Sequence, residues 1–368
     1  ERDIAIINTT DNSLVGHILD VGTTINALRW DDGLGALMVS GLRNDTQASL
    51  SFVDQPNFWH EVRAISPQPG LVSVLASADL TRQDSSGGHA VTLHAAARDG
   101  DTLWVTAESS DLVIGLAADT LAETARFEVV GRPRHVVAHD GAIFAHGQQA
   151  FSITRAEAGV VTHTEATATD PRPAEVAAGQ AYFTGAGRDY AQNWSCNSCH
   201  ADGLTDGLIW NAGPFSDRIV ARPFFWLEGT YPLGWAGYLS GVRNYALSVN
   251  TNVGIRPTTG EFEDLWSYMA SLMPPPAANG WTERDGSLSA EGLAGKALYE
   301  GKGGCATCHA TPLTTNRASF AEGITPGVSD VPALVGIYRH GAWLKFGDAF
   351  TLLDGVAAAD DWLGGYLE

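Results

Sequence analysis

Two short stretches of this sequence carry the same pattern of sulfur and imidazole side chains, Cys196-Asn197-Ser198-Cys199-His200 and Cys305-Ala306-Thr307-Cys308-His309. In a Cys-x-x-Cys-His motif both thiols can form thioethers to one haem, and the adjacent histidine ligates its iron. Cysteines three positions apart lie about one helical turn apart, so both sulfurs reach the same porphyrin edge. The sequence therefore predicts two covalently bound haem c groups, with His200 and His309 as proximal iron ligands.

The same cysteines admit two other interpretations. Two CxxC pairs could build a four-cysteine zinc site, or one pair could act as a redox dithiol. A zinc site does not need a histidine after both pairs. These four are also the only cysteines in the chain, so none is left over for a disulfide. Both facts favour haem attachment.

The charge of the chain disfavours some partner classes. Its 368 residues carry a formal net charge of −20, which argues against nucleic acid and against an anionic membrane surface. Negative charge instead speeds docking of a basic redox partner protein, such as a small basic cytochrome. No apolar run approaches the 18 or so residues of a membrane span, and no signal peptide is recognisable, so we expect a mature or shortened chain. Because c-type haem attachment belongs to exported proteins, we expect a periplasmic or extracellular location in a bacterium.

Residues 1–166 have the pattern of β structure. Asp-Gly pairs at 32–33, 99–100 and 140–141 separate apolar runs, which is a strong hairpin signal. The last two pairs lie 41 positions apart, about the length of one propeller blade, whereas the first gap requires an insertion around 44–70. About four blades would be at the low end for a closed propeller. We expect an incomplete propeller-like domain, completed by further blades or by another chain; a plain β-sandwich is the alternative.

The remainder is predicted to be mainly helical and internally duplicated. A linker over 167–173 precedes a helix at 174–183, and a similar helix at 289–299 precedes the second motif, with Ser289 as its N-cap. An amphipathic helix at 261–273 ends before three prolines. The expected fold is thus multidomain: an all-β propeller-like domain (1–166) followed by two mainly α cytochrome c-type haem domains (172–280 and 284–368).

Two resemblances to known families support this division. The stretches 6–22 and 121–133 resemble the repeat of YVTN-type propellers, which runs from strand to polar turn to strand and ends in a Val-Gly step. From about 172 onward the chain resembles the bacterial di-haem cytochrome c peroxidase superfamily, which includes the enzyme that matures methylamine dehydrogenase. The matching stretches are Trp194-Ser195 with the first motif, 295–304 with the second, and 330–338. Some members of that superfamily carry a propeller in front of the haem domains.

The resemblance implies one high-potential haem that passes electrons, one open haem that meets peroxide, and a tryptophan between them. Trp235 falls where the family has that tryptophan, although Ala236 replaces the aspartate that usually follows. Trp235 is therefore expected to relay electrons between the haems; a core tryptophan is the alternative. The family's distal Glu-Met pair is missing from 244–255, and Lys345 and Phe346 replace a His-Asp pair.

The distal iron ligands are consequently open. Met269 and Met273 share a helix face, and His340 and Lys345 lie near the second motif, with Tyr338 a weaker candidate. A histidine of the β domain could also reach a haem: His89, His94, His135, His139, His146 or His163. An empty coordination position is a further alternative. Some relatives bind calcium between the haem domains, but no carboxylate cluster argues for it here.

Three functional hypotheses follow. The first is a di-haem c-type cytochrome that transfers electrons on a peroxidase-like scaffold lacking the distal peroxidase residues. The second is an active di-haem peroxidase or oxidase that uses one open haem. The third is a haem-bearing subunit of a larger extracytoplasmic complex, docked through the β domain.

Overall fold

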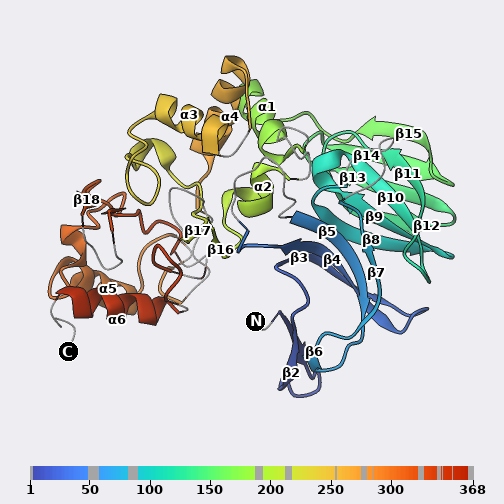
Figure 1. The fold of residues 1–368 in the computed structure, drawn as a ribbon, viewed down its shortest axis with the longest axis horizontal. Coiled ribbons are helices and arrows are strands. Elements are labelled where there is room, and N and C mark those ends of the chain that lie inside the picture. Colours follow the sequence, from blue (N-terminus) through green and yellow to red (C-terminus); the bar gives the residue numbers. More distant parts are fainter. Residues whose placement is uncertain are drawn as a thin grey trace. The chain divides into compact units, whose positions relative to one another are not determined.

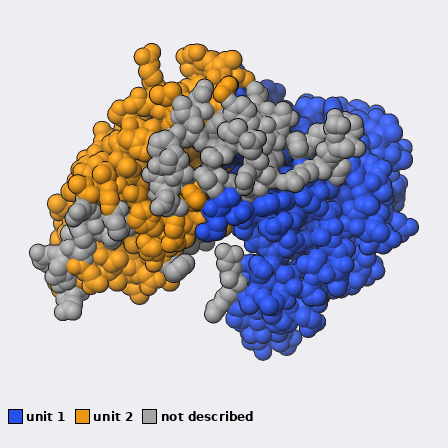
Figure 2. Space-filling model, in the orientation of Figure 1, with its two compact units in different colours: residues 1–48, 52–198 blue, residues 49–51, 199–368 orange. Residues whose placement is uncertain are grey.

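The computed structural model forms two compact units, residues 1–48 with 52–198 and residues 49–51 with 199–368 (Figure 2). The structure describes residues 3–48, 58–81, 90–186, 194–211, 218–252, 255–274, 280–283, 285–321, 327–337, 341, 343–349 and 351–363. The division falls inside the first motif, after Ser198. The domain boundaries expected from the sequence stay predictions.

The first unit contains three four-stranded antiparallel sheets in which chain order equals strand order (Figure 1). Sheet one comprises β3 (Thr24–Asp31), β4 (Ala36–Asn44), β5 (Phe58–Ile65) and β7 (Val74–Asp79). Sheet two comprises β8 (Leu93–Asp99), β9 (Thr102–Ala107), β10 (Leu112–Ala117) and β11 (Glu123–Glu128). Sheet three comprises β12 (Pro133–His139), β13 (Ala142–Gly147), β14 (Ser152–Glu157) and β15 (Val160–Ala166). Four-stranded meanders of this kind are the blades of propellers.

The Asp-Gly pairs connect strands as the sequence predicted. His139 pairs with Ala142, so Asp140 and Gly141 form a two-residue turn, and both have positive φ (50° and 77°). Such a turn matches the right-handed twist of the flanking strands. The turn at Gly100 also joins paired strands, β8 and β9, and the 32–33 pair lies in the loop between β3 and β4.

The sheets are held together by apolar layers between neighbouring blades. Strand β8 lies against β3 of one neighbour and β12 of the other. One layer includes Met38, Leu93 and Ile114, which are almost fully buried. The next includes Trp104 and Phe127, whose ring centroids are 5.7 Å apart. Burial of these side chains is the main term that stabilises the blade stack.

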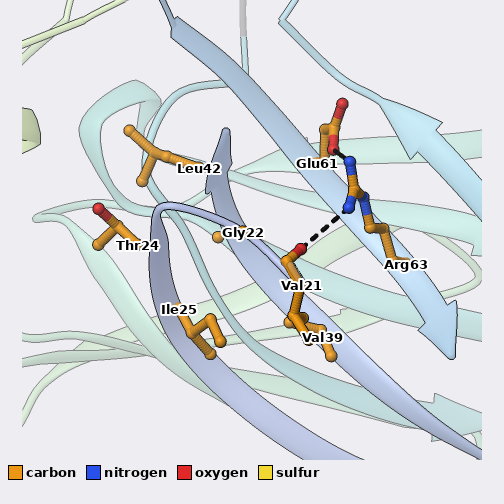
Figure 3. A pocket seen from close by; sticks show the side chains of 9 residues that line it. Val21, Gly22, Thr24, Ile25, Val39, Leu42, Glu61 and Arg63 are labelled. Carbon is orange, nitrogen blue, oxygen red and sulfur yellow. Dashed lines mark hydrogen bonds and ion pairs between the residues drawn. The ribbon is translucent and has the colours of Figure 1, made fainter. Parts of the chain in front are cut away.

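A small three-stranded sheet combines the first two strands of the chain with a short strand that lies between β5 and β7 in the sequence. Strand β1 (Ile4–Ile7) pairs with β2 (Leu14–Leu19), and β2 pairs in parallel with β6 (Gly70–Leu71). A hollow beside it is lined by residues of β3, β4 and β5, with the ion pair of Arg63 and Glu61 on one side (Figure 3). Arg63 also donates to the carbonyl of Val21 at 2.9 Å.

The second unit repeats one plan at a spacing of 110 residues, which confirms the predicted duplication. The hairpin β16 (Ile209–Trp210) and β17 (Ile219–Val220) corresponds to β18 (Ser319–Phe320) and β19 (Ser329–Asp330). The bridge between Leu233 and Leu239 corresponds to the bridge between Trp343 and Ala349. Helix α3 (Val242–Asn252) corresponds to α6 (Leu352–Leu363). We call residues 196–252 the first CxxCH module and residues 305–363 the second.

The predicted helices form close to their expected bounds. Helix α1 (Ala174–Thr184) belongs to the first unit, and α5 (Ala290–Glu300) begins after Ser289, whose hydroxyl accepts from Gly292 N. Helix α4 (Thr259–Ser271) starts with a capping box between Thr258 and Glu261. Its apolar stripe is buried, and Trp266 stacks on Tyr231 with ring centroids 6.0 Å apart.

Candidate haem-attachment sites

The second motif is a tight turn with an oriented imidazole. Residues Cys305–Thr307 form a 3-10 turn, and His309 follows directly. Nδ1 of His309 lies 3.1 Å from the carbonyl oxygens of both Thr314 and Pro332. An Nδ1–H held by a carbonyl fixes the tautomer and leaves Nε2 as the free ligand nitrogen. This is the arrangement that a proximal iron ligand requires.

The first motif reproduces this surrounding at the corresponding positions of the repeat. Helix α2 (Cys196–Cys199) carries the two thiols. The carbonyls of Leu204 and Arg222, which correspond to those of Thr314 and Pro332, face His200 closely enough to influence its titration. His200 Nδ1 nevertheless makes no hydrogen bond of ordinary geometry with the described residues. The ring of Phe224 packs on the imidazole, with centroids 4.2 Å apart.

Burial sets the protonation of both motifs. It lowers the pKa of His200 to about 4, against the opposing effect of the two backbone carbonyls, and it lowers the pKa of His309 as well. Both imidazoles are therefore neutral at pH 7, as metal ligation requires. Burial also raises the pKa of the Cys196 thiol to about 12. A redox dithiol needs a lowered thiol pKa, so the first motif does not fit that alternative.

The residues of each motif fit a covalently bound haem. None of the four cysteines is in a disulfide. Among the residues that the structure describes, no three His, Cys, Asp or Glu side chains come together in a metal-binding group, as a four-cysteine zinc site would require. Helix α5, next to the second motif, buries none of its residues and presents Leu293 and Leu298 to solvent. A porphyrin attached at Cys305 and Cys308 would supply an apolar surface beside this helix.

Trp235 lies where the two modules exchange backbone hydrogen bonds. Its indole Nε1 donates to the carbonyl of Val220 at 2.8 Å, and its own carbonyl accepts from Asp330 N at 2.9 Å. The guanidinium of Arg222 stacks on its ring, 4.8 Å from the centroid, and pairs with the Asp330 carboxylate at 3.2 Å. Trp235 thus contacts backbone close to both proximal histidines.

The candidate distal iron ligands differ from one another in burial and in hydrogen-bond partners. Met269 is 1% exposed and lies 4.0 Å from the Tyr245 hydroxyl, whereas Met273 is 58% exposed and accepts from the indole of Trp226. Lys345 donates to the carbonyl of Val328 at 3.1 Å and lies over the ring of Phe346. His340 and Tyr338 lie outside the described residues, as does His89. The ligand roles of all these side chains stay predictions.

Two site residues were missed by the sequence argument. Asp206 accepts from Leu208 N and from the indole Nε1 of Trp210, each at 3.0 Å, and its own N–H donates to the Cys199 carbonyl. Burial raises its pKa to about 7, against those hydrogen bonds. The other missed residue is Arg222, described above. An alignment of the two repeats would have pointed to Asp206, because Asn316 occupies the equivalent position and makes the same turn.

Comparisons with known proteins give partial likeness only. No family model and no curated protein matches the chain. A hydrazine synthase structure from Kuenenia stuttgartiensis matches with 21% identity and a TM-score of 0.43, over 50% of this chain and 78% of that chain. A MauG-like protein associated with microbial copper homeostasis matches with 14% identity and a TM-score of 0.40, over 52% and 75%. The WD40 repeats of RRP9 match with 13% identity and a TM-score of 0.28, over 38% of each chain. At these scores the likeness carries no argument about function.

No helix in the described part of the chain is long and apolar enough to cross a membrane.

Proposed function

We propose that this chain is a di-haem c-type cytochrome that transfers electrons on a scaffold like that of the di-haem peroxidases. The observation that carries the proposal is the repeated surrounding of the two motif histidines, each neutral and each faced by the same pair of backbone carbonyls. When bound, each haem supplies a reversible one-electron couple. The chain orients the imidazoles and joins the two modules by backbone hydrogen bonds beside Trp235.

Trp235 is the proposed electron relay between the modules. Its indole and carbonyl bind Val220 and Asp330, and Pro332, which faces His309, is two residues beyond Asp330. Arg222, which stacks on the indole, is also the residue whose carbonyl faces His200. A short bonded route therefore connects the surroundings of the two proximal ligands through one aromatic side chain.

The distal side supports electron transfer over peroxide cleavage. The stretch in which peroxidases carry their Glu-Met pair lies largely in α3 here, and the sequence has no carboxylate or methionine from 244 to 255. Breaking the O–O bond needs an acid–base group in reach of the substrate. The second candidate, a peroxidase or oxidase, gains support from Lys345 and Met273: both are engaged by other groups of the protein, which favours an open position on one iron.

Partner and location complete the proposal. The charge of −20 suits a basic redox partner in the periplasm or outside the cell, and the exposed blade edges suit docking of the β unit within a larger complex. Calcium between the haem modules is not part of the proposal.

Low-temperature EPR of the fully oxidised protein, integrated against haem content, tests the function. Two low-spin signals of equal weight are expected for an electron carrier with six-coordinate irons. A stoichiometric high-spin signal would favour the enzyme, and peroxide turnover would then be assayed. Fewer than two covalent haems per chain would contradict both candidates.

A further inference from the structure

A buried ionic cluster in the β unit contacts the first motif directly. Glu108 begins the 3-10 turn η1 (Glu108–Ser110) at the end of β9, and it is only 1% exposed. Its Oε1 accepts from Arg134 Nε at 2.6 Å, and its Oε2 lies 2.8 Å from His94 Nε2. Arg134 and His94 come from β12 and β8, the neighbouring first strands of two blades. Each oxygen of this buried carboxylate therefore contacts a side chain from the first strand of a blade.

The third partner of Glu108 comes from the haem motif itself. Asn197, between Cys196 and Cys199, donates from Nδ2 to Glu108 Oε2 at 3.3 Å and is 3% exposed. Beside it, the Ser195 hydroxyl lies 3.3 Å from that of Ser109, which donates to Thr92. Every side chain of this contact is buried, and all of them belong to the first unit.

The second motif has no equivalent of this contact. Ala306 occupies the position of Asn197 and has no side-chain polar group. The residues of its turn, Cys305–Thr307, are not buried. Among the described residues, the contact with the Glu108 cluster thus belongs to the motif of Cys196 and Cys199.

We propose that Glu108 and Arg134 are positioning residues that set the reduction potential of the first haem, so that the β unit forms part of that haem's electrostatic surroundings. This inference rests on the proposed two-haem function. Reduction adds an electron, so a nearby buried carboxylate disfavours it and a nearby guanidinium favours it. Charges act more strongly in a buried, low-dielectric site than in water. Asn197 couples the pair to the motif, since it is hydrogen-bonded to Glu108, directly follows Cys196 and lies two residues before Cys199.

Spectroelectrochemical titration of the full haem-loaded chain tests the inference. Glu108→Gln removes a negative charge and is expected to shift the first haem to a more positive potential. Arg134→Gln removes a positive charge while His94 and Asn197 stay in contact with Glu108, and it is expected to shift the first haem to a more negative potential. The potential of the second haem should stay the same in both variants. Repeating the titration with Cys305→Ser/Cys308→Ser assigns the two potentials.

Two further variants separate charge from packing. Arg134→Lys keeps the charge and should stay close to the wild-type potential, whereas a purely geometric role predicts a shift like that of Arg134→Gln. Asn197→Ala keeps both charges and should move the potential less than either charge variant. Should Glu108→Gln fail to load haem, the two Arg134 variants decide alone. Shifts of the same sign in Glu108→Gln and Arg134→Gln, or equal shifts of both haems, would overturn the inference. A wild-type chain without two haems would instead overturn the proposed function.

Discussion

The two CxxCH modules share a backbone plan, yet the protein surrounds their attachment motifs differently. In the first, Asn197 and Ser198 are buried, and Asn197 donates to Glu108 of the β unit. In the second, the preceding helix α5 buries no residue. Helix α1, the counterpart of α5, buries Tyr182 and Phe183 and accepts a hydrogen bond from Arg132 at Ala181 O. The duplicated fold thus surrounds the first motif with buried protein groups and leaves the helix before the second motif exposed.

The modules also hold each other through a reciprocal exchange. The carbonyl of Trp235 accepts from Asp330 N, and the carbonyl of Lys345, at the corresponding position, accepts from Val220 N at 3.1 Å. Each bond joins one module to the short hairpin of the other. The two backbone hydrogen bonds are equivalent, but the side chains at the two positions differ: the first module has the aromatic Trp235 and the second has Lys345. In the proposed relay, only the first module supplies the aromatic side chain.

Removing the attachment cysteines should give the largest difference between the modules. Cys305→Ser/Cys308→Ser and Cys196→Ser/Cys199→Ser are each expected to lower the covalent haem content from two per chain to one. Protein contacts already hold α1, so its amide hydrogen exchange should change little when the first haem is lost. Exchange in α5 should rise strongly when the second is lost. Pyridine haemochrome spectra and exchange mass spectrometry measure the two quantities.

Equal changes of protection in α1 and α5 would contradict the difference in surroundings. A chain that keeps two haems in either double variant would show that these cysteines are not the attachment points. The matched control is the single variant Lys296→Ala on α5. It removes an exposed ion pair with Glu300 at 3.7 Å and should leave haem content and exchange unchanged.

The strands, turns and repeated modules could be predicted from the sequence because their signals are local. The Asp-Gly turn at 140–141, the Ser289 cap and the repeated CxxCH motif each act within a few residues. Contacts between distant segments carry no such signal. Nothing near Glu108 in the sequence indicates that it binds Asn197, 89 positions later, or that Arg222 stacks on Trp235. The distal iron ligands could not be predicted for the same reason, because the fold decides which side chain lies beside the iron.

Substitution of two equivalent glycines should weaken the packing beside the hydrogen bonds that join the modules. The effect should be smaller than that of removing the attachment cysteines. Gly237 (φ 64°) and Gly347 (φ 69°) each lie against the other module's hairpin. A Cβ at 237 would meet Ser319 and Asp330, and one at 347 would meet Ile209 at 2.7 Å. Gly→Ala at either position is expected to destabilise the second unit by about 1–3 kcal/mol, through positive φ and close contact.

Calorimetric unfolding of the haem-loaded chain measures the effect, and Gly260→Ala provides the control. Gly260 lies in the first turn of α4 with no atom within 4 Å of an added Cβ, so its substitution should leave stability unchanged or slightly raised. Similar losses at 237 and 347 would confirm that the exchange is symmetric in energy. A loss at 237 only would show that the Trp235 side alone holds the modules together.

A further expected effect is a pH dependence confined to the first module. Burial raises the pKa of Asp206 from 3.8 to about 7, so the folded state favours its neutral form. Its contribution to stability is complete below the unfolded pKa of 3.8 and is lost as the pH rises through about 7. Asp206→Asn, which copies Asn316 of the second module, should remove this dependence and leave the second unit more stable than wild type above pH 7.

Melting temperatures of the haem-loaded wild-type and variant chains between pH 4 and 8 test the sign, because the difference between them cancels the other carboxylates. The control is Asp285→Asn. Hydrogen bonds from Ser287 lower the pKa of this exposed carboxyl, so its contribution is present above pH 3.8 and is lost as the pH falls. The two variants should therefore change the pH profile in opposite directions. A profile of Asp206→Asn that is parallel to wild type would mean that the carboxyl is already ionised in the folded protein. In that case Asp206 would be charged throughout this pH range whereas Asn316 of the second module is neutral, and the difference between the modules at this position would not depend on pH.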